Sequence, residues 1–125
     1  MARPKSDSLT PLELEIMNVL WDVGTANVQT VQRRLARDPA YTTVQTILNI
    51  LEKKGRVKRE MKDRAYMYSP AVSRKKVINQ IFGDMIDRVF GGSAESLVMS
   101  LLETKHITPE KLEELNRLVN KEDKG

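Results

Sequence analysis

The chain has 125 residues, enough for one domain or two very small ones, and its 40% hydrophobic and 30% charged residues favour a folded protein over a disordered one. It contains no cysteine and a single histidine, His106, which excludes disulfides, a thiol nucleophile and a histidine-rich metal cluster. No apolar run approaches the roughly 20 residues of a membrane span, so we expect a soluble, cytoplasmic protein with no membrane partner.

The positive charge lies in the first part of the chain. Lysine and arginine number 21 against 17 aspartates and glutamates, a net charge of +4. Residues 1–70 hold 12 basic and 8 acidic side chains, whereas residues 71–125 hold 9 of each, and seven of the basic ones fall within residues 53–64. Such a local excess attracts polyanions, nucleic acid above all, although a solvated surface is the alternative.

Two helices are predicted before residue 40. Residues 10–13, Thr-Pro-Leu-Glu, form a capping box with proline in the first turn, and Gly24 ends the helix that follows. A second, short helix fits residues 28–36, where valines and a leucine share one face. The dipeptide Asp38-Pro39 then breaks the helical pattern.

A third helix and a β-hairpin follow. The helix is expected to begin near Tyr41, where a threonine can cap it, and to end at Gly55. Residues 57–61 and 65–68 alternate as two strands, joined by the loop at residues 62–64. Three helices followed by a hairpin are the element order of a winged helix-turn-helix, which lays its third helix in the major groove of DNA.

Two groups of side chains would contact DNA in this fold. The polar face of the third helix is uncharged and carries hydroxyl and amide groups that can bond base edges or phosphates, whereas an ordinary solvated face is usually rich in Glu and Lys. These candidates are Thr42, Thr43, Gln45, Thr46 and Asn49. The candidates for phosphate contacts are Lys53, Lys54, Arg56, Lys62, Arg64 and Tyr66.

The remaining residues predict a helical region that forms a dimer. Apolar pairs recur every four residues over 77–90, and two further amphipathic helices follow. These helices carry more apolar surface than they can bury alone, so a second copy of the chain is expected to cover it, the alternative being the N-terminal domain. The candidate interface residues are Val77, Ile78, Ile81, Phe82, Met85, Ile86, Val89, Leu97, Leu101, Leu115 and Leu118.

The expected fold class is therefore mainly α with a small β-hairpin. It comprises a flexible arm at residues 1–8, a winged-helix DNA-binding domain at residues 9–71 and a helical dimerisation domain at residues 72–125. A DNA-binding repressor fits this organisation, with no cofactor. The alternative is a winged-helix adaptor that binds proteins without sequence-specific DNA binding. An enzyme is disfavoured, because no set of nucleophile, base and orienting group is present.

Three stretches, in order and correctly spaced, resemble the penicillinase repressor family (the BlaI/MecI type). They are residues 9–21, with Leu-Thr-Pro-Leu-Glu-Leu at the start, residues 41–55, with Tyr-Thr-Thr-Val-Gln-Thr-Ile-Leu, and residues 64–70, Arg-Ala-Tyr-Met-Tyr-Ser-Pro. The resemblance implies a homodimeric repressor of β-lactam-resistance genes that binds a palindromic operator. It also implies that the C-terminal helices serve dimerisation.

The chain departs from this family at identifiable positions. Family members under β-lactam control are cleaved between an Asn and a Phe, with a sensor-linked protease as partner, and Ser100 and Leu101 occupy these candidate cleavage positions here. Ile50 stands where the family commonly carries an arginine. The absence of cysteine separates the chain from the related copper-responsive repressors, which carry a cysteine-rich tail.

Overall fold

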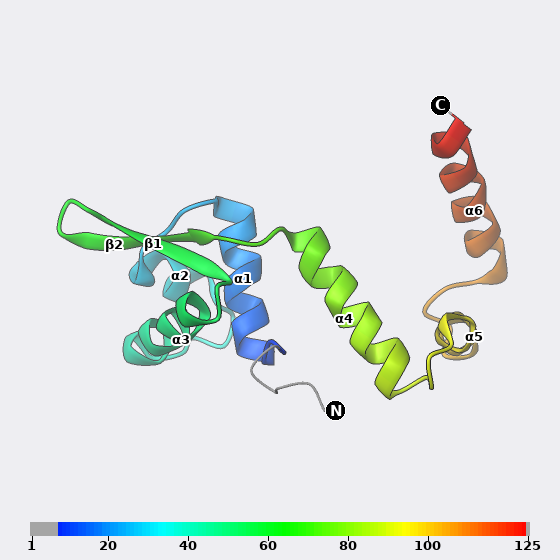
Figure 1. Ribbon diagram of the computed structural model, residues 1–125, viewed down its shortest axis with the longest axis horizontal. Helices are drawn as coiled ribbons and strands as arrows, with labels where there is room; N and C mark the ends of the chain where they lie inside the picture. The colour runs from blue at the N-terminus through cyan, green and yellow to red at the C-terminus, as the bar shows by residue number, and fades with distance from the viewer. Residues whose placement is uncertain (1–7, 125) are drawn as a thin grey trace. The chain divides into compact units, whose positions relative to one another are not determined.

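The computed structural model describes residues 8–124 and confirms the predicted fold class (Figure 1). The expected arm at residues 1–8 thus lies outside the described residues except for Ser8. The chain divides into two compact units, Met1–Asn79 and Gln80–Gly125, with the boundary inside a helix, whereas the sequence places the domain boundary after residue 71. The elements are α1 (Pro11–Val23), α2 (Val28–Arg34), α3 (Tyr41–Lys53), β1 (Val57–Lys62), β2 (Ala65–Pro70), α4 (Arg74–Arg88), α5 (Ala94–Glu103) and α6 (Pro109–Lys124).

The start of α1 confirms the predicted capping box. The Thr10 backbone N–H donates to Glu13 Oε1 at 2.7 Å, and the Glu13 N–H donates to Thr10 Oγ1 at 3.2 Å. These two bonds satisfy backbone donors that a helix start otherwise leaves unpaired. At the other end Gly24, with φ of +88°, terminates the helix as expected.

The boundaries of the next two helices differ from the prediction. The second helix ends at Arg34 rather than Ala36, because Leu35 turns to extended backbone and places its side chain in the core. The residue that caps α3 is Ala40, so the predicted threonine cap is wrong. The threonines lie instead in the first turn of α3, where their side chains are exposed.

The hairpin turns more tightly than the sequence suggested. Lys62 pairs with Ala65 in the antiparallel register, so the loop has two residues, Asp63 and Arg64, and not three. Both have positive φ, 51° and 68°, which suits the right-handed twist of a two-residue hairpin. Beyond the hairpin, β2 is bound through Tyr68 to Ala26, by backbone hydrogen bonds of 2.9 and 2.8 Å.

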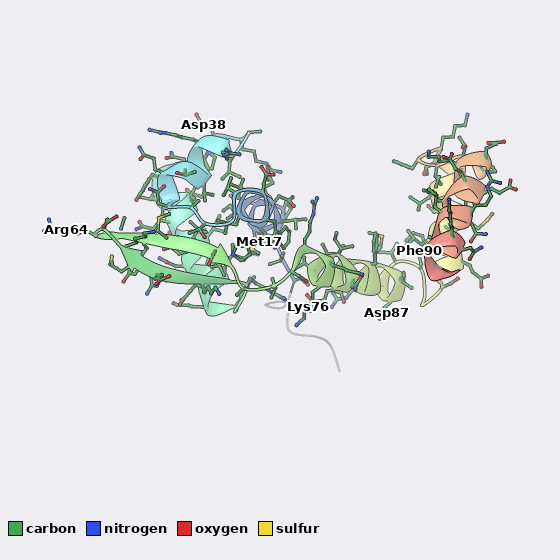
Figure 2. All side chains as sticks on the ribbon, turned by 90° about the horizontal axis from the view of Figure 1, so that it is seen from above. Met17, Asp38, Arg64, Lys76, Asp87 and Phe90 are labelled. Atoms are coloured by element: carbon green, nitrogen blue, oxygen red, sulfur yellow. The ribbon has the colours of Figure 1, made fainter. Side chains whose placement is uncertain are left out.

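The first unit is built around one hydrophobic core. It is formed by α1, α2 and α3 together with the hairpin, and Met17 lies inside it (Figure 2). The indole N–H of Trp21 donates to the Val72 carbonyl at 3.0 Å, which fixes the segment leading to α4. The core consists of Ile16, Met17, Leu20, Ala26, Val28, Val31, Leu35, Val44, Leu48, Leu51, Val57 and Tyr68.

The second unit has no comparable core among the residues that the structure describes. Its helices α5 and α6 are well capped, by the hydroxyls of Ser93 and Thr108. The fourth predicted apolar pair, Val89 and Phe90, lies past the end of α4 at Arg88. Yet no side chain from residue 80 to residue 121 is buried.

No helix in the described part of the chain is long and apolar enough to cross a bilayer.

Candidate nucleic-acid interface

The outward face of α3 is polar and uncharged. Val44, Leu48 and Leu51 are fully buried, so the opposite side of the helix faces away from the core. That side exposes four of the predicted base-reading residues, Thr42, Thr43, Gln45 and Thr46. Among the described residues, none hydrogen-bonds to the hydroxyl of Thr42, Thr43 or Thr46. These groups are therefore available to an outside partner.

Two further residues of α3 have different surroundings. Ile50 is 41% exposed, so the position where an arginine is expected carries an accessible apolar side chain. Asn49 is half-buried, and its Oδ1 accepts hydrogen bonds from the Tyr68 hydroxyl at 3.1 Å and from Arg59 Nη1 at 3.4 Å. The amide oxygen of Asn49 is thus engaged within the protein.

Exposed cations lie at the end of α3 and in the hairpin that comes after it in the chain. Lys53 ends α3, Lys62 ends β1, and Arg64 lies at the tip of the hairpin (Figure 2). Arg56 is half-buried at the start of the hairpin. The sequence did not single out Arg59, which stacks over the Tyr66 ring with 4.4 Å from the guanidinium carbon to the ring centroid.

A cleft of about 430 Å³ joins α3 to the hairpin. Three of the predicted site residues, Gln45, Arg64 and Tyr66, line it together. Asn27 and Tyr41, which the sequence did not single out, also line it. Amides, phenol rings and a guanidinium are groups that bond the phosphates and sugars of a nucleic-acid backbone. The structure thus places part of the predicted polar face and part of the predicted cationic set around one depression.

Lys54 has a partner inside the protein. Its Nζ lies 2.9 Å and 3.2 Å from the carboxylate oxygens of Glu13, and it also donates to the Ser8 carbonyl at 3.3 Å. The side chain of Glu13 is only 4% exposed. Burial by itself raises the pKa of Glu13, but hydrogen bonds from the Thr10 backbone and the Lys54 ammonium outweigh it and lower the pKa below its ordinary value of 4.5. This contact ties the end of α3 to the start of α1.

We expect Lys54→Met to destabilise the protein by about 1.5–3 kcal/mol at neutral pH, because a nearly buried carboxylate loses a charge-assisted partner. The pKa of Glu13 is lower in the folded chain than in the unfolded one, so its ionised form stabilises the fold above about pH 4.5. That stabilisation is lost as the pH falls through the folded-state pKa. Glu13→Gln should remove this part of the pH dependence.

Urea unfolding at about pH 7 and pH 4 measures both effects. The matched control is Lys53→Met at the exposed neighbouring lysine, which should change the free energy of unfolding by no more than about 0.5 kcal/mol. Equal stability of Lys54→Met and the wild-type chain at pH 7 would show that the contact with Glu13 contributes nothing.

Most of the predicted dimer residues are exposed in the single chain. Three are half-buried, Met85, Ile86 and Leu97, and Val77 is buried. The other seven are between 36% and 71% exposed: Ile78, Ile81, Phe82, Val89, Leu101, Leu115 and Leu118. Ser100 and Leu101, the candidate cleavage positions, lie inside α5.

The fold and the interface define a winged-helix regulator. Across 91% of this chain and 75% of the other, the backbone is similar to that of an E. coli MarR mutant solved with operator DNA, with a TM-score of 0.53 and 14% identity. Residues 9–121 match the penicillinase repressor family, and the chain belongs to this family.

Two relatives illustrate the relationship. The penicillinase repressor of Bacillus licheniformis is 26% identical over 117 residues, which are 92% of this chain and 91% of that protein. The transcriptional regulator BlaI of Mycobacterium tuberculosis is 32% identical over 103 residues, 79% of this chain and 75% of the relative.

Proposed function

We propose that the protein is a transcriptional repressor that binds a palindromic DNA operator as a homodimer. The observation that carries this proposal is the exposed, uncharged polar face of α3 lying beside a cationic hairpin in one compact unit. Membership of the penicillinase repressor family supports it. The protein acts by occupying its operator and excluding polymerase, a function of binding and not of catalysis.

The two surfaces divide the task of recognition. Thr42, Thr43, Gln45 and Thr46 present donors and acceptors to base edges in the major groove. The cations Lys53, Lys62 and Arg64 neutralise phosphates and fix the register of the protein on the duplex. Tyr66 lines the cleft beside Arg64 and adds a hydroxyl for the backbone.

The exposed apolar side chains of the second unit support the proposed dimer. Its described side chains include Phe82, Leu115 and Leu118, which are 48%, 39% and 52% exposed, and none of its side chains up to residue 121 is buried. A helical unit of this size lacks the core that independent stability requires. A second copy of the chain presents the same apolar surface. In a dimer with a two-fold axis, these two identical surfaces pack against each other.

Selection of bound sequences from a random duplex pool tests the proposal. We expect enrichment of one inverted repeat whose two half-sites lie about one helical turn or a multiple of it apart. Enrichment of a single half-site would contradict the dimer. A pool that shows no sequence preference, at a salt concentration where binding is measurable, would contradict the repressor function and favour an adaptor.

Base reading by α3 predicts a selective effect of Thr46→Ala. The exposed hydroxyl contributes nothing to the core, so folding should be unchanged, while operator binding weakens by about 1–3 kcal/mol if a base-edge bond is lost. Affinity for random duplex should hardly change. Competition binding with both DNAs measures the difference. Equal losses on the two DNAs would place Thr46 on the backbone instead.

A sensor-linked protease is a further proposed partner, with a sequence requirement that differs from the family pattern. The bond between Ser100 and Leu101 lies within α5, so a protease reaches it only after local opening of the helix. We expect a protease that reads Asn-Phe to leave the chain intact and Ser100→Asn with Leu101→Phe to be cut faster. Mass spectrometry of the digests distinguishes these results, and efficient cleavage of the unmodified bond would contradict the expectation.

A further inference from the structure

Asn49 connects the two elements of the DNA-binding surface. It lies on α3, and its Oδ1 accepts from the hydroxyl of Tyr68 on β2 at 3.1 Å and from the guanidinium of Arg59 on β1 at 3.4 Å. Arg59 and Tyr68 are directly opposite each other in the hairpin register. One amide oxygen is therefore bound to both strands of the hairpin.

The chemistry of the partners fixes the orientation of this amide. Arginine has only donors, so the atom of Asn49 that faces Arg59 must be the oxygen and not the nitrogen. Tyr68 is 1% exposed, and a buried tyrosine hydroxyl needs a hydrogen-bond partner. Asn49 supplies the acceptor for both groups.

The link continues toward the tip of the hairpin. Arg59 stacks over Tyr66, which stands two residues before Tyr68 on the same face of β2. Tyr66 is 41% exposed, and Met61, which pairs with it, is 55% exposed. This outer part of the hairpin therefore lies outside the hydrophobic core. Arg64 lies beyond it at the turn. The contacts from Asn49 to Arg59 and from Arg59 to Tyr66 thus extend to the part of the hairpin that does not pack in the core.

We propose that Asn49 is a positioning residue, which sets the spacing between α3 and the hairpin so that both reach the same DNA. This inference rests on the proposed function. Asn49 acts through Tyr68 and Arg59 and not through a base edge, in contrast to Thr46 on the same helix. Holding the two surfaces at a fixed spacing before binding removes part of the ordering cost of association.

Affinity measurements on the full chain separate positioning from base reading. Tyr68→Phe should weaken operator binding about three- to tenfold, the size of one lost hydrogen bond, and Asn49→Ala by at least that factor, because it also removes the acceptor of Arg59. The double variant should bind no more weakly than Asn49→Ala alone, because removing Asn49 already breaks the bond to Tyr68. Neither should relax the preference at any single base pair, whereas Thr46→Ala, the matched control, should do so.

Asn49→Asp provides the conservative rescue. It keeps the acceptor oxygens for Tyr68 and Arg59, removes the amide donors and adds a negative charge, which lowers the affinity for all duplexes alike. Base preferences should therefore remain those of the wild type. If Asn49 reads a base through its amide nitrogen, Asn49→Asp will lose preference at one position and Tyr68→Phe will bind normally, which overturns the proposal.

Hydrogen exchange of the free protein supplies a readout without DNA. Tyr68→Phe should speed exchange of the hairpin amides between residues 59 and 67, Asn49→Ala should speed it by at least the same factor, and Asn49→Asp should not. Unchanged exchange in the first two variants would overturn the proposal, whatever the DNA result. Failure of the wild-type chain to bind any duplex would instead overturn the proposed function, while the exchange rates still decide whether Asn49 holds the hairpin.

Discussion

Phe82→Asp is expected to leave the protein monomeric at micromolar concentration and to abolish tight operator binding. Phe82 is 48% exposed in the single chain, and the proposed dimer buries it. Truncation of a core phenylalanine to alanine costs about 3–5 kcal/mol, and a carboxylate adds the penalty of an unpaired buried charge. A two-fold dimer contains the substitution twice, so the effect is doubled at one interface.

Sedimentation equilibrium measures this effect directly. The wild-type chain should sediment at roughly twice the 14.3 kDa of one chain, and the variant at that mass itself. Asp87→Lys is the matched control, since five residues on the same helix turn the side chain about 140° away from Phe82. It should remain dimeric. A monomeric wild-type chain at micromolar concentration would contradict the dimer.

Operator affinity is expected to fall about a thousandfold between 50 and 200 mM salt. Lys53, Lys62 and Arg64 are exposed on each chain, so a dimer presents six of these cations to phosphates. Each neutralised phosphate contributes about −0.9 to the log–log slope, which gives a slope near −5. Lys62→Ala removes one contact per chain and should make the slope shallower by about 2.

The control for this series is a lysine of equal charge outside the DNA-binding unit. Lys105→Ala, in the turn after α5, should leave the slope unchanged. Lys62→Ala should weaken specific and random duplexes alike, because phosphates carry no sequence information. A slope near zero for the wild-type chain would contradict the assignment of the three cations to DNA.

Local signals in the sequence predicted most of the fold. The capping box at Thr10 and Glu13, the terminating Gly24 and the change from helical to alternating periodicity after Gly55 are each read within a few residues. The errors are also local. The prediction took a threonine as the cap of α3, but the cap is Ala40, two residues before the first of the threonines, and the helix begins at Tyr41.

Roles that depend on distant partners could not be predicted in this way. Lys53 and Lys54 are adjacent and chemically identical, yet only Lys54 meets a carboxylate, 41 positions away along the chain. In the sequence Asn49 resembles its polar neighbours on α3. Only the structure shows that it bonds to Tyr68, 19 positions further along the chain. Periodicity indicates which side of a helix is outward, but tertiary contacts decide which outward groups remain available.

The confinement of the core to the first unit has a consequence for the control of repression. Two half-site readers joined in one dimer act through a high effective concentration, and such avidity can exceed the affinity of one reader by a factor of about 10²–10⁴. In the proposed dimer, cutting α5 or separating the C-terminal helices would remove that gain, while the core around Met17 and Leu48 would stay intact. The operator would then be released because two folded DNA-binding units are no longer linked, and no conformational change of α3 would be required.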